Sequence, residues 1–552
     1  MVSGMPFLTD AHPSIVSLER IDYYYKMLQF NLQRVSISML FGSNRVLDTL
    51  LLVSFAAGLF VLCARTCRKK LHGIFSSVIH SFLVWKYPIR SISSDQPIPT
   101  CPYQWPNGQG DIGKFLEGEE NSEKWGMRYG RVYRLWSGMT SEVVLRDPAD
   151  VKTVFWDSDK HIKAVNNDAG WLMGELLGQC VGLISGQRYH KLRTVVNPPF
   201  THKKALTRHN HIIGATKAYM DDLFSSGKLQ HNLINPVADL KYLPFWIMVE
   251  MLYGKLSPEL KNDLENLIPL RDSLWGHIIQ GGAARYSLTK RLLFNVTEDL
   301  RVFKHKWALF NEAACEAAKD TVEEPAIVSM YMEVKSGTIL KEELLQTLDE
   351  MLFANLDVTM GGLSWPLLFL AADSHVQDQL RQEIRATREI DTTGSGWEAY
   401  LQSSSTLLAA SILEASRLKP LAAFTVPQAA PTDRIVSGFL VPAGTNYIVD
   451  THALNTKNTY WGHDKKDRET YRPSRFLDRK QSEMRYQFWR FGFGPRQCLG
   501  KYVVDIVLRA VVAFLVENFQ LGLSEKTHWG KNPSTWILHP DTEILCERLD
   551  EH

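Results

Sequence analysis

The sequence predicts a mainly α-helical fold with small β-sheets. Apolar residues recur at helical spacing in long stretches that begin near residues 203, 258, 341 and 376. Alternation typical of strands is confined to short pieces at residues 133–144 and 435–449. From about residue 100 to the C-terminus there is no internal repeat, low-complexity tract or second linker, so one large domain is expected.

Length and composition narrow the class of protein. A chain of 552 residues with 45% apolar content can form one large enzyme domain with a tail. The net charge of +2 and the lack of long like-charge blocks give no reason to expect nucleic acid as a partner. The seven cysteines are scattered and odd in number, which favours a reducing, cytosol-facing compartment over a disulfide framework.

Residues 46–64, VLDTLLLVSFAAGLFVLCA, are predicted to form a transmembrane anchor. This stretch is close to the lower length limit for spanning a bilayer, about 17 to 20 residues. Basic residues between positions 65 and 70 place the following domain on the cytosolic side. We therefore expect a single-pass membrane protein, with the endoplasmic reticulum as its compartment. A buried core helix is the alternative, whereas a signal peptide would begin nearer residue 1.

The predicted anchor divides the chain. Residues 1–45 form an N-terminal extension with no assignable role, and residues 65–99 form a juxtamembrane segment and a proline-containing linker. Within that segment, the moderately apolar residues 71–86 are expected to lie on the membrane surface. The catalytic domain is expected to span residues 100–552.

The stretch FGFGPRQCLG, residues 491–500, has features of a loop that presents a metal-bound thiolate. Its glycines allow tight turns and close approach to a flat ligand, and Arg496 places a cation two residues before Cys498. A nearby cation and the backbone N–H groups at the start of the following helix favour the thiolate form of a cysteine. The alternative is a structural or redox-inert cysteine.

These ten residues resemble the haem-binding signature FxxGxRxCxG of the cytochromes P450. The matching positions are Phe491, Gly494, Arg496, Cys498 and Gly500. The resemblance implies the cytochrome P450 fold, with haem b as the cofactor and Cys498 as the thiolate ligand of its iron.

Two further segments match the family in the expected order. SILEASRLKP contains Glu414 and Arg417, which resemble the family's ExxR pair, and YRPSRF resembles its PxRF element, with Arg475 as the arginine. The resemblance implies that Glu414, Arg417 and Arg475 form a buried network that holds the cysteine loop in place.

The propionates of the haem are expected to contact basic residues. GQRYHKLR resembles the family's WxxxR helix, with Tyr189 in the tryptophan position and Arg193 as the arginine, although an ordinary amphipathic helix is the alternative. Arg496 is the second expected partner. The basic residue that many members carry after the ExxR helix is absent here, where Pro427 and Gln428 lie. Haem anchoring is therefore expected to depend more on Arg193 and Arg496.

The distal segment departs from the family. Ala354 to Thr359, ANLDVT, resembles (A/G)GxDT(T/S), but Asn355 replaces the usual glycine and Val358 takes the position of the usual alcohol. On a regular helix Thr359 is rotated by about 100° from that position, unless a local bulge brings it back. One hypothesis has Asp357 relay protons with Asn355, Thr359, water or a substrate hydroxyl. A second hypothesis is that activated oxygen is released as peroxide. A third is that Asp357 has a purely structural role, with its carboxylate bonded by neighbouring groups.

The expected substrate pocket is apolar. The resemblance places five residues there, namely Ala354, Val358, Leu421, Ala422 and Phe424. Their small or apolar side chains suggest a substrate with a hydrophobic or aromatic part.

The resemblance implies a monooxygenase that inserts one oxygen atom from O2 into a small molecule. No dinucleotide-binding fingerprint is convincing, so NADPH electrons are expected to come from a separate NADPH–cytochrome P450 reductase, with cytochrome b5 as a further donor. A basic docking surface is expected around the cysteine loop, unless these are ordinary solvated charges: Arg472, Arg479, Lys480, Arg485, Arg490 and Lys501.

Within the family, FANLDVTMGG and WRFGFGPRQCLGKYVVD look most similar to fungal enzymes of secondary metabolism, including those acting on cyclic dipeptides of the epipolythiodioxopiperazine toxins. Two alternatives stay open. One is an enzyme of the same fold that rearranges, dehydrates or couples its substrate without inserting oxygen. The other is a non-catalytic haem-binding sensor.

Overall fold

The computed structural model describes residues 65–163, 170–226, 232–321, 324–391 and 394–549. It divides into two compact units, Met1–Ile74 and Phe75–His552. Helix α3, Arg65–Lys86, contains the boundary. None of the helices in these ranges is long and apolar enough to cross a membrane. The predicted extension 1–45 and the predicted anchor 46–64 lie outside the described residues.

The second unit begins before residue 100, because the end of α3 packs into it. Leu83 is fully buried in a cluster with Tyr103 and Trp136. The opposite face of the same helix carries large apolar side chains that are 47–76% exposed, namely Phe75, Val78, Phe82 and Trp85.

The predicted mainly α-helical fold is confirmed. Predicted helical stretches correspond to α11, Pro258–Gln280, to α14, Lys341–Ala372, and to α15, Ser374–Ile390. The stretch near residue 203 forms the short α8, His202–Leu206, and then α9, His209–Ser225. The other helices are α4 Gly118–Tyr129, α5 Pro148–Phe155, α6 Trp171–Leu177, α7 Gly186–Val196, α10 Tyr242–Tyr253, α12 Phe294–Ala318, α13 Ala326–Lys335, α16 Ser395–Gln402, α17 Leu407–Leu418, α18 Thr451–Thr456, α19 Lys465–Glu469, α20 Ser474–Leu477, α21 Gln481–Met484 and α22 Lys501–Asn518.

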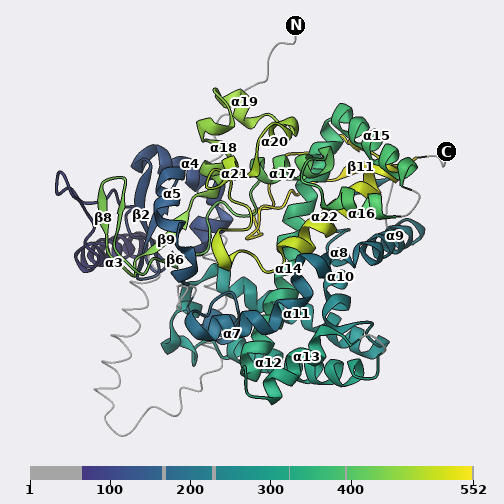
Figure 1. Ribbon diagram of the computed structural model, residues 1–552. Helices are drawn as coiled ribbons and strands as arrows, with labels where there is room; N and C mark the ends of the chain where they lie inside the picture. The colour runs from purple at the N-terminus through teal and green to yellow at the C-terminus, as the bar shows by residue number, and fades with distance from the viewer. Residues whose placement is uncertain (1–64, 164–169, 227–231, 322–323, 392–393, 550–552) are drawn as a thin grey trace. The chain divides into compact units, whose positions relative to one another are not determined.

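Helix α14 is the central element of the second unit. Its 32 residues are apolar on nearly every side, and they pack against α10, α17 and α22. Figure 1 shows α14 in the middle of the helical part, with α10, α11 and α22 around it. A helix that is apolar all round is stable only when neighbours cover it, which explains its buried position.

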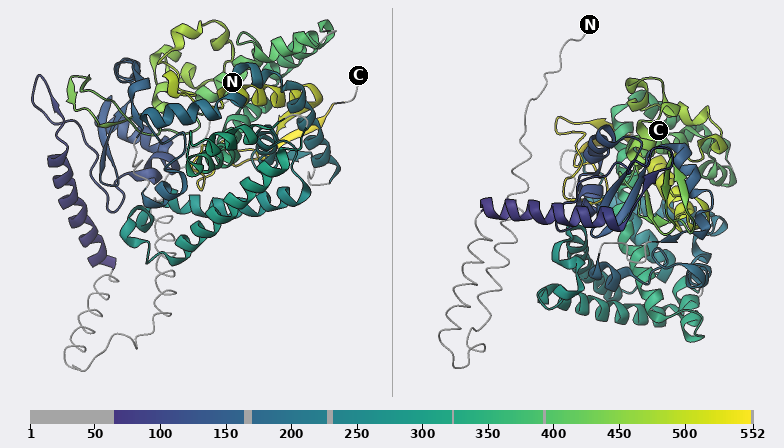
Figure 2. Two further views of the ribbon diagram at one scale, coloured as in Figure 1. Left: turned by 60° about the horizontal axis from the view of Figure 1, so that its bottom comes forward. Right: turned by 90° about the vertical axis from the view of Figure 1, so that its left-hand side faces the viewer.

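The strands form three small sheets. Two of them lie on the other side of this unit, and Figure 2 shows them in front of the helices when that side faces the viewer. The third, which contains residues 519–523 and 544–548, packs against α14 and α22 instead. The largest sheet has the order β2-β3-β9-β6-β4. It comprises β2 Val132–Ser137, β3 Thr140–Leu145, β9 Asn446–Val449, β6 Gln428–Ala429 and β4 Ile162–Lys163.

Both predicted strand regions are confirmed. Residues 133–144 form the β2–β3 hairpin, and residues 435–449 contain β7 Arg434–Val436, β8 Phe439–Val441 and β9. Strand β1, Arg90–Ser91, joins β8 and β7 in a second sheet. The third sheet joins β10 Phe519–Leu523, β11 Ile544–Arg548 and β5 Leu233–Ile234.

Candidate functional site

The cysteine loop has the geometry expected of a tight turn. The backbone N–H of Cys498 donates to the carbonyl of Phe491 at 2.9 Å, which closes the loop before α22 begins at Lys501. Gly494 has φ +71°, and a Cβ added to it would lie 2.2 Å from Oγ of Ser158. This glycine is therefore required by the turn and by packing against Ser158.

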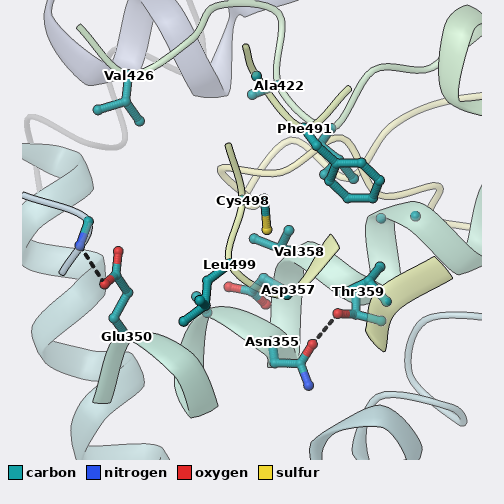
Figure 3. Close-up of a pocket in the computed structure, with 18 of the residues that line it drawn as sticks. Glu350, Asn355, Asp357, Val358, Thr359, Ala422, Val426, Phe491, Cys498 and Leu499 are labelled. Carbon is teal, nitrogen blue, oxygen red and sulfur yellow. Dashed lines mark hydrogen bonds between the residues drawn. The ribbon is translucent and has the colours of Figure 1, made fainter. Parts of the chain in front are cut away.

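The side chain of Cys498 lines a large internal cavity. Figure 3 shows its sulfur pointing toward the part of α14 that carries Val358. Burial raises the pKa of the Cys498 thiol, while the backbone N–H of Gly500 and the positive charge of Arg193 oppose this rise. The guanidinium of Arg496 lies against the ring of Tyr189, 4.0 Å from its centroid.

The predicted network of Glu414, Arg417 and Arg475 is present. The Glu414 carboxylate accepts from Arg417 Nε at 2.7 Å and from Arg475 Nε at 3.2 Å. All three residues are at most 2% exposed. Because an unpaired charge in this position would be costly, the three side chains stabilise one another only as a set.

A second set of bonds connects this network to the cysteine loop. Arg417 Nη1 donates to the carbonyl of Asn455 at 3.0 Å. The Asn455 side chain then donates to the carbonyl of Trp489 and accepts from its N–H, both at 3.0 Å. Trp489 lies two residues before the loop. Sequence reasoning missed Asn455, since an isolated asparagine carries no motif.

The distal residues of α14 differ from the expectation. The helix is α-helical without interruption from Lys341 to Ala372, so the local bulge that would return Thr359 to the alcohol position is absent from it. Thr359 instead donates its hydroxyl to Asn355 Oδ1, one turn earlier, as Figure 3 shows. Asn355 Nδ2 in turn donates to the carbonyl of Pro244 in α10 at 2.9 Å. These two side chains therefore bond to each other and to a neighbouring helix.

Asp357 is held by residues from the C-terminal part of the chain. Its Oδ2 accepts from the indole N–H of Trp536 at 2.8 Å, and its backbone carbonyl lies 2.7 Å from Nε2 of His539. Sequence reasoning missed both partners, which are about 180 residues away along the chain. The carboxylate borders the cavity and has a defined hydrogen-bond donor.

The cavity has a volume of about 550 Å³, which suits a small molecule. The predicted residues Ala354, Val358, Leu421, Ala422 and Phe424 all line it. Three aromatic residues that sequence reasoning missed lie together in its wall. The ring centroids of Phe115 and Trp536 are 6.4 Å apart, and those of Trp275 and Trp536 are 5.3 Å apart.

Comparison with known proteins agrees with this geometry. The family model "Cytochrome P450" matches residues 113–546. The chain belongs to the cytochrome P450 family. It is 47% identical to the cytochrome P450 monooxygenase aclC of Aspergillus oryzae over 470 residues, covering 84% of this chain and 95% of the relative. It is 44% identical to the cytochrome P450 monooxygenase asaD of Aspergillus flavus, covering 86% and 91%, and 38% identical to gliC of Aspergillus fumigatus, covering 88% and 96%. The prediction of a cytochrome P450 enzyme is confirmed.

Membership of the cytochrome P450 family implies a haem whose iron is bound by a cysteine thiolate. The residues present fit this group, because the Cys498 sulfur faces the cavity and basic side chains line the same cavity. Arg193 donates to the carbonyl of Gln497 at 3.4 Å, and Arg496 donates to the carbonyl of Ile184 at 2.6 Å. Tyr189 is buried with its ring against Arg496. Phe491 and Gly500 also line the cavity.

The expected basic docking surface is only partly available. Arg490 is paired with Asp505 at 2.6 Å, with 12% of its side chain exposed, so it is not an exposed member of that surface. Arg479 is partly buried and donates to the carbonyl of Tyr460 at 3.1 Å. The remaining basic residues of the prediction are exposed or half-buried, namely Arg472, Lys480, Arg485 and Lys501.

Proposed function

We propose that this cytochrome P450 is a haem-thiolate monooxygenase that inserts one oxygen atom from O2 into a small, largely hydrophobic secondary metabolite. The observation that carries the proposal is Cys498, whose sulfur faces an apolar cavity from a loop held by a buried network. When bound, the haem supplies the activation of oxygen. The relatives aclC, asaD and gliC are named monooxygenases, which supports the same activity here.

Residues of the chain itself have distinct tasks in this proposal. Asp357 holds a proton-accepting carboxylate at the cavity wall, with Trp536 donating to it, and transfers protons with the help of water or a substrate hydroxyl. Asn355 and Thr359 orient α14 against α10 instead of contacting the proton path directly. Val358 excludes water from the position that an alcohol would otherwise occupy.

The aromatic wall supports a substrate with a flat or aromatic part. Phe115, Trp275 and Trp536 present ring faces and edges to the cavity, and Leu421 and Ala422 add apolar surface. A cyclic dipeptide with an aromatic side chain is the substrate class that we favour, since the sequence segments around α14 and Cys498 resemble fungal enzymes acting on such compounds.

A second function has one specific observation in its favour. Val358 and the uninterrupted α14 leave the usual alcohol position without a hydroxyl. This favours rearrangement, dehydration or coupling without oxygen insertion, or partial loss of electrons to peroxide. The remaining alternative, a non-catalytic haem-binding sensor, would consume no NADPH when reductase and substrates are present.

Electrons from NADPH are proposed to arrive through NADPH–cytochrome P450 reductase, with cytochrome b5 as a second donor, and the partners dock near Arg472, Lys480 and Arg485. We further propose a single-pass protein of the endoplasmic reticulum, anchored by residues 46–64. The exposed apolar side chains of Phe75 and Trp85 on α3 support contact with a lipid surface.

The test begins with the spectrum of the reduced, carbon monoxide-bound protein. A red-shifted thiolate band is expected, and a spectrum without it would contradict the proposal. The full-length protein is then incubated with reductase, NADPH and ¹⁸O2, using the metabolite that accumulates when the gene is deleted. One ¹⁸O atom in the product indicates a monooxygenase, whereas a converted but unlabelled product indicates the second function.

A further inference from the structure

A buried arginine of α11 has free hydrogen-bond donors at the cavity wall. Arg271 is 4% exposed and lines the cavity that contains Cys498. Its Nε donates to Oδ1 of Asp349 in α14 at 2.7 Å. Among the residues that the structure describes, neither Nη group of Arg271 bonds to an acceptor, and neither is fully enclosed by protein. Buried donors normally have partners, so a ligand in the cavity is expected to supply the acceptor.

The guanidinium of Arg271 is held in place by its surroundings. It lies 5.0 Å from the ring centroid of Trp275 and 5.6 Å from that of Phe353, in addition to its bond with Asp349. Trp275 packs against Trp536, whose indole N–H donates to Asp357. The donors of Arg271 are therefore fixed in the aromatic wall before a substrate binds, which lowers the entropy cost of binding.

The next residue of α11 offers an acceptor in the same cavity. Asp272 lines the cavity, and its Oδ2 lies 3.5 Å from Nζ of Lys241. In the described part of the chain, its Oδ1 accepts no hydrogen bond. Burial raises the pKa of Asp272, and the charge of Asp357 adds to this rise, so the two carboxyl groups are neighbours. This part of the wall thus carries free donors and a free acceptor.

The local charges indicate what kind of acceptor suits Arg271. Two cations, Arg271 and Lys241, face three carboxylates, Asp272, Asp349 and Asp357. The excess of one negative charge disfavours an anionic substrate at this position. A neutral carbonyl oxygen avoids this repulsion and still accepts a charge-assisted hydrogen bond from the guanidinium. An N–H group of the substrate suits the carboxylate of Asp272 in the same way.

We propose that Arg271 and Asp272 bind the edge of a cis-amide in the substrate. The Nη groups of Arg271 donate to the carbonyl oxygen, and Oδ1 of Asp272 accepts from the adjacent N–H. A lactam ring presents both groups on one edge without a charge, and a cyclic dipeptide contains two such edges. This inference rests on the proposed function and extends it, because it names the polar group by which the substrate is recognised.

Binding titrations of the haem-loaded, full-length protein test this proposal through the spectral shift of the haem. The probes are cyclo(Phe-Phe) and 1,4-dibenzylcyclohexane, which keeps the ring and the benzyl groups but has neither carbonyl nor N–H. The unaltered protein is expected to bind the dipeptide more tightly. The double variant R271M/D349L replaces the ion pair with apolar residues and leaves no charge unpaired. It should raise the Kd of the dipeptide about 10- to 100-fold and leave that of the hydrocarbon unchanged.

Two controls separate the donors of Arg271 from the ion pair. Asp349→Asn keeps both Nη groups and should keep the preference for the dipeptide. The double variant R301M/E298L removes an ion pair of α12 whose side chains are 68% and 42% exposed, and it should bind both probes like the unaltered protein.

The acceptor is tested in the same assay. Asp272→Leu should raise the Kd of cyclo(Phe-Phe) about 10-fold but leave that of its N,N′-dimethyl derivative, which has no N–H, unchanged. Asp263→Leu changes an exposed aspartate of the same helix and is the matched control, with no change expected for either compound.

The proposal is overturned if the unaltered protein does not prefer cyclo(Phe-Phe) to the hydrocarbon, or if R271M/D349L keeps that preference. Loss of the preference in Asp349→Asn would also overturn it, because the ion pair and not the donors would then be responsible. Tighter binding of N-acetylphenylalanine than of its methylamide would show that the site selects an anion. The thiolate band and ¹⁸O incorporation are separate readouts, so a protein that retains both while failing these tests loses this inference alone.

Discussion

The two sides of the cavity are built differently. On the proximal side, the Glu414 carboxylate accepts four hydrogen bonds, from Arg417 twice, from Arg475 and from the backbone N–H of Arg472. On the distal side, the Asp357 carboxylate accepts one from Trp536. The proximal loop contains only the short 3₁₀ turn Gly494–Arg496, so it depends on the polar network, whereas a continuous helix already positions the distal groups. Distal residues can therefore vary with less loss of stability.

The largest expected effect is on the proximal side. Cys498→Ser removes the thiolate and should abolish both the red-shifted carbon monoxide band and product formation, because a serine hydroxyl is a poor ligand for this role. Cys315→Ser, at a buried cysteine of α12 outside the cavity, should keep the band. A normal band in Cys498→Ser would show that another residue binds the iron.

The network itself is expected to have the second largest effect. Glu414→Gln leaves Arg417 and Arg475 without their buried counter-charge and should lower the free energy of unfolding by about 3–5 kcal/mol. The measurement is urea unfolding of the haem-loaded protein. Glu312→Gln is the control, since Glu312 pairs with Lys341 while both side chains are nearly half exposed, and a change of about 0–1 kcal/mol is expected there. Equal changes in the two variants would contradict the network's role.

On the distal side, Asp357→Asn should reduce the rate of product formation by about 100-fold with little effect on substrate binding, as is typical for loss of a proton-transferring group. The rate, the peroxide formed and the spectral binding constant are measured together. Thr359→Val is the control, because its hydroxyl is bonded to Asn355, and it should change the rate only slightly. A comparable loss in Thr359→Val would place this hydroxyl in the proton path.

The smallest expected effect separates the hydrogen bond to Asp357 from the aromatic wall. Trp536→Phe keeps a ring but removes the indole donor, and it should increase the share of electrons lost to peroxide by about 2- to 10-fold. Trp275→Phe is a closely matched control in the same aromatic group, since its indole nitrogen is buried and has no hydrogen-bond partner among the described residues. Equal uncoupling in both variants would attribute the effect to lost packing.

The contiguous motifs were predictable from the sequence. Their geometry depends on neighbours within one or two helical turns, so the spacing of residues along the chain predicts it. These motifs are the loop around Cys498, the pair Glu414–Arg417 and the starts of α11 and α14. The bulge that could have brought Thr359 to the alcohol position is absent from α14, because packing around this helix favours an unbroken helix.

Contacts between segments that are distant in the chain were decided only by the tertiary structure. Asp357 meets Trp536, Asn455 meets Trp489, and Lys163 meets Gln428 through strand register. Such pairs depend on how helices and strands pack, and neither partner carries a local signal. The sequence by itself therefore determined the family, the cysteine loop and the residues of the network that supports this loop. The packing of the whole unit decided which side chains hold Asp357 and which cations surround Cys498.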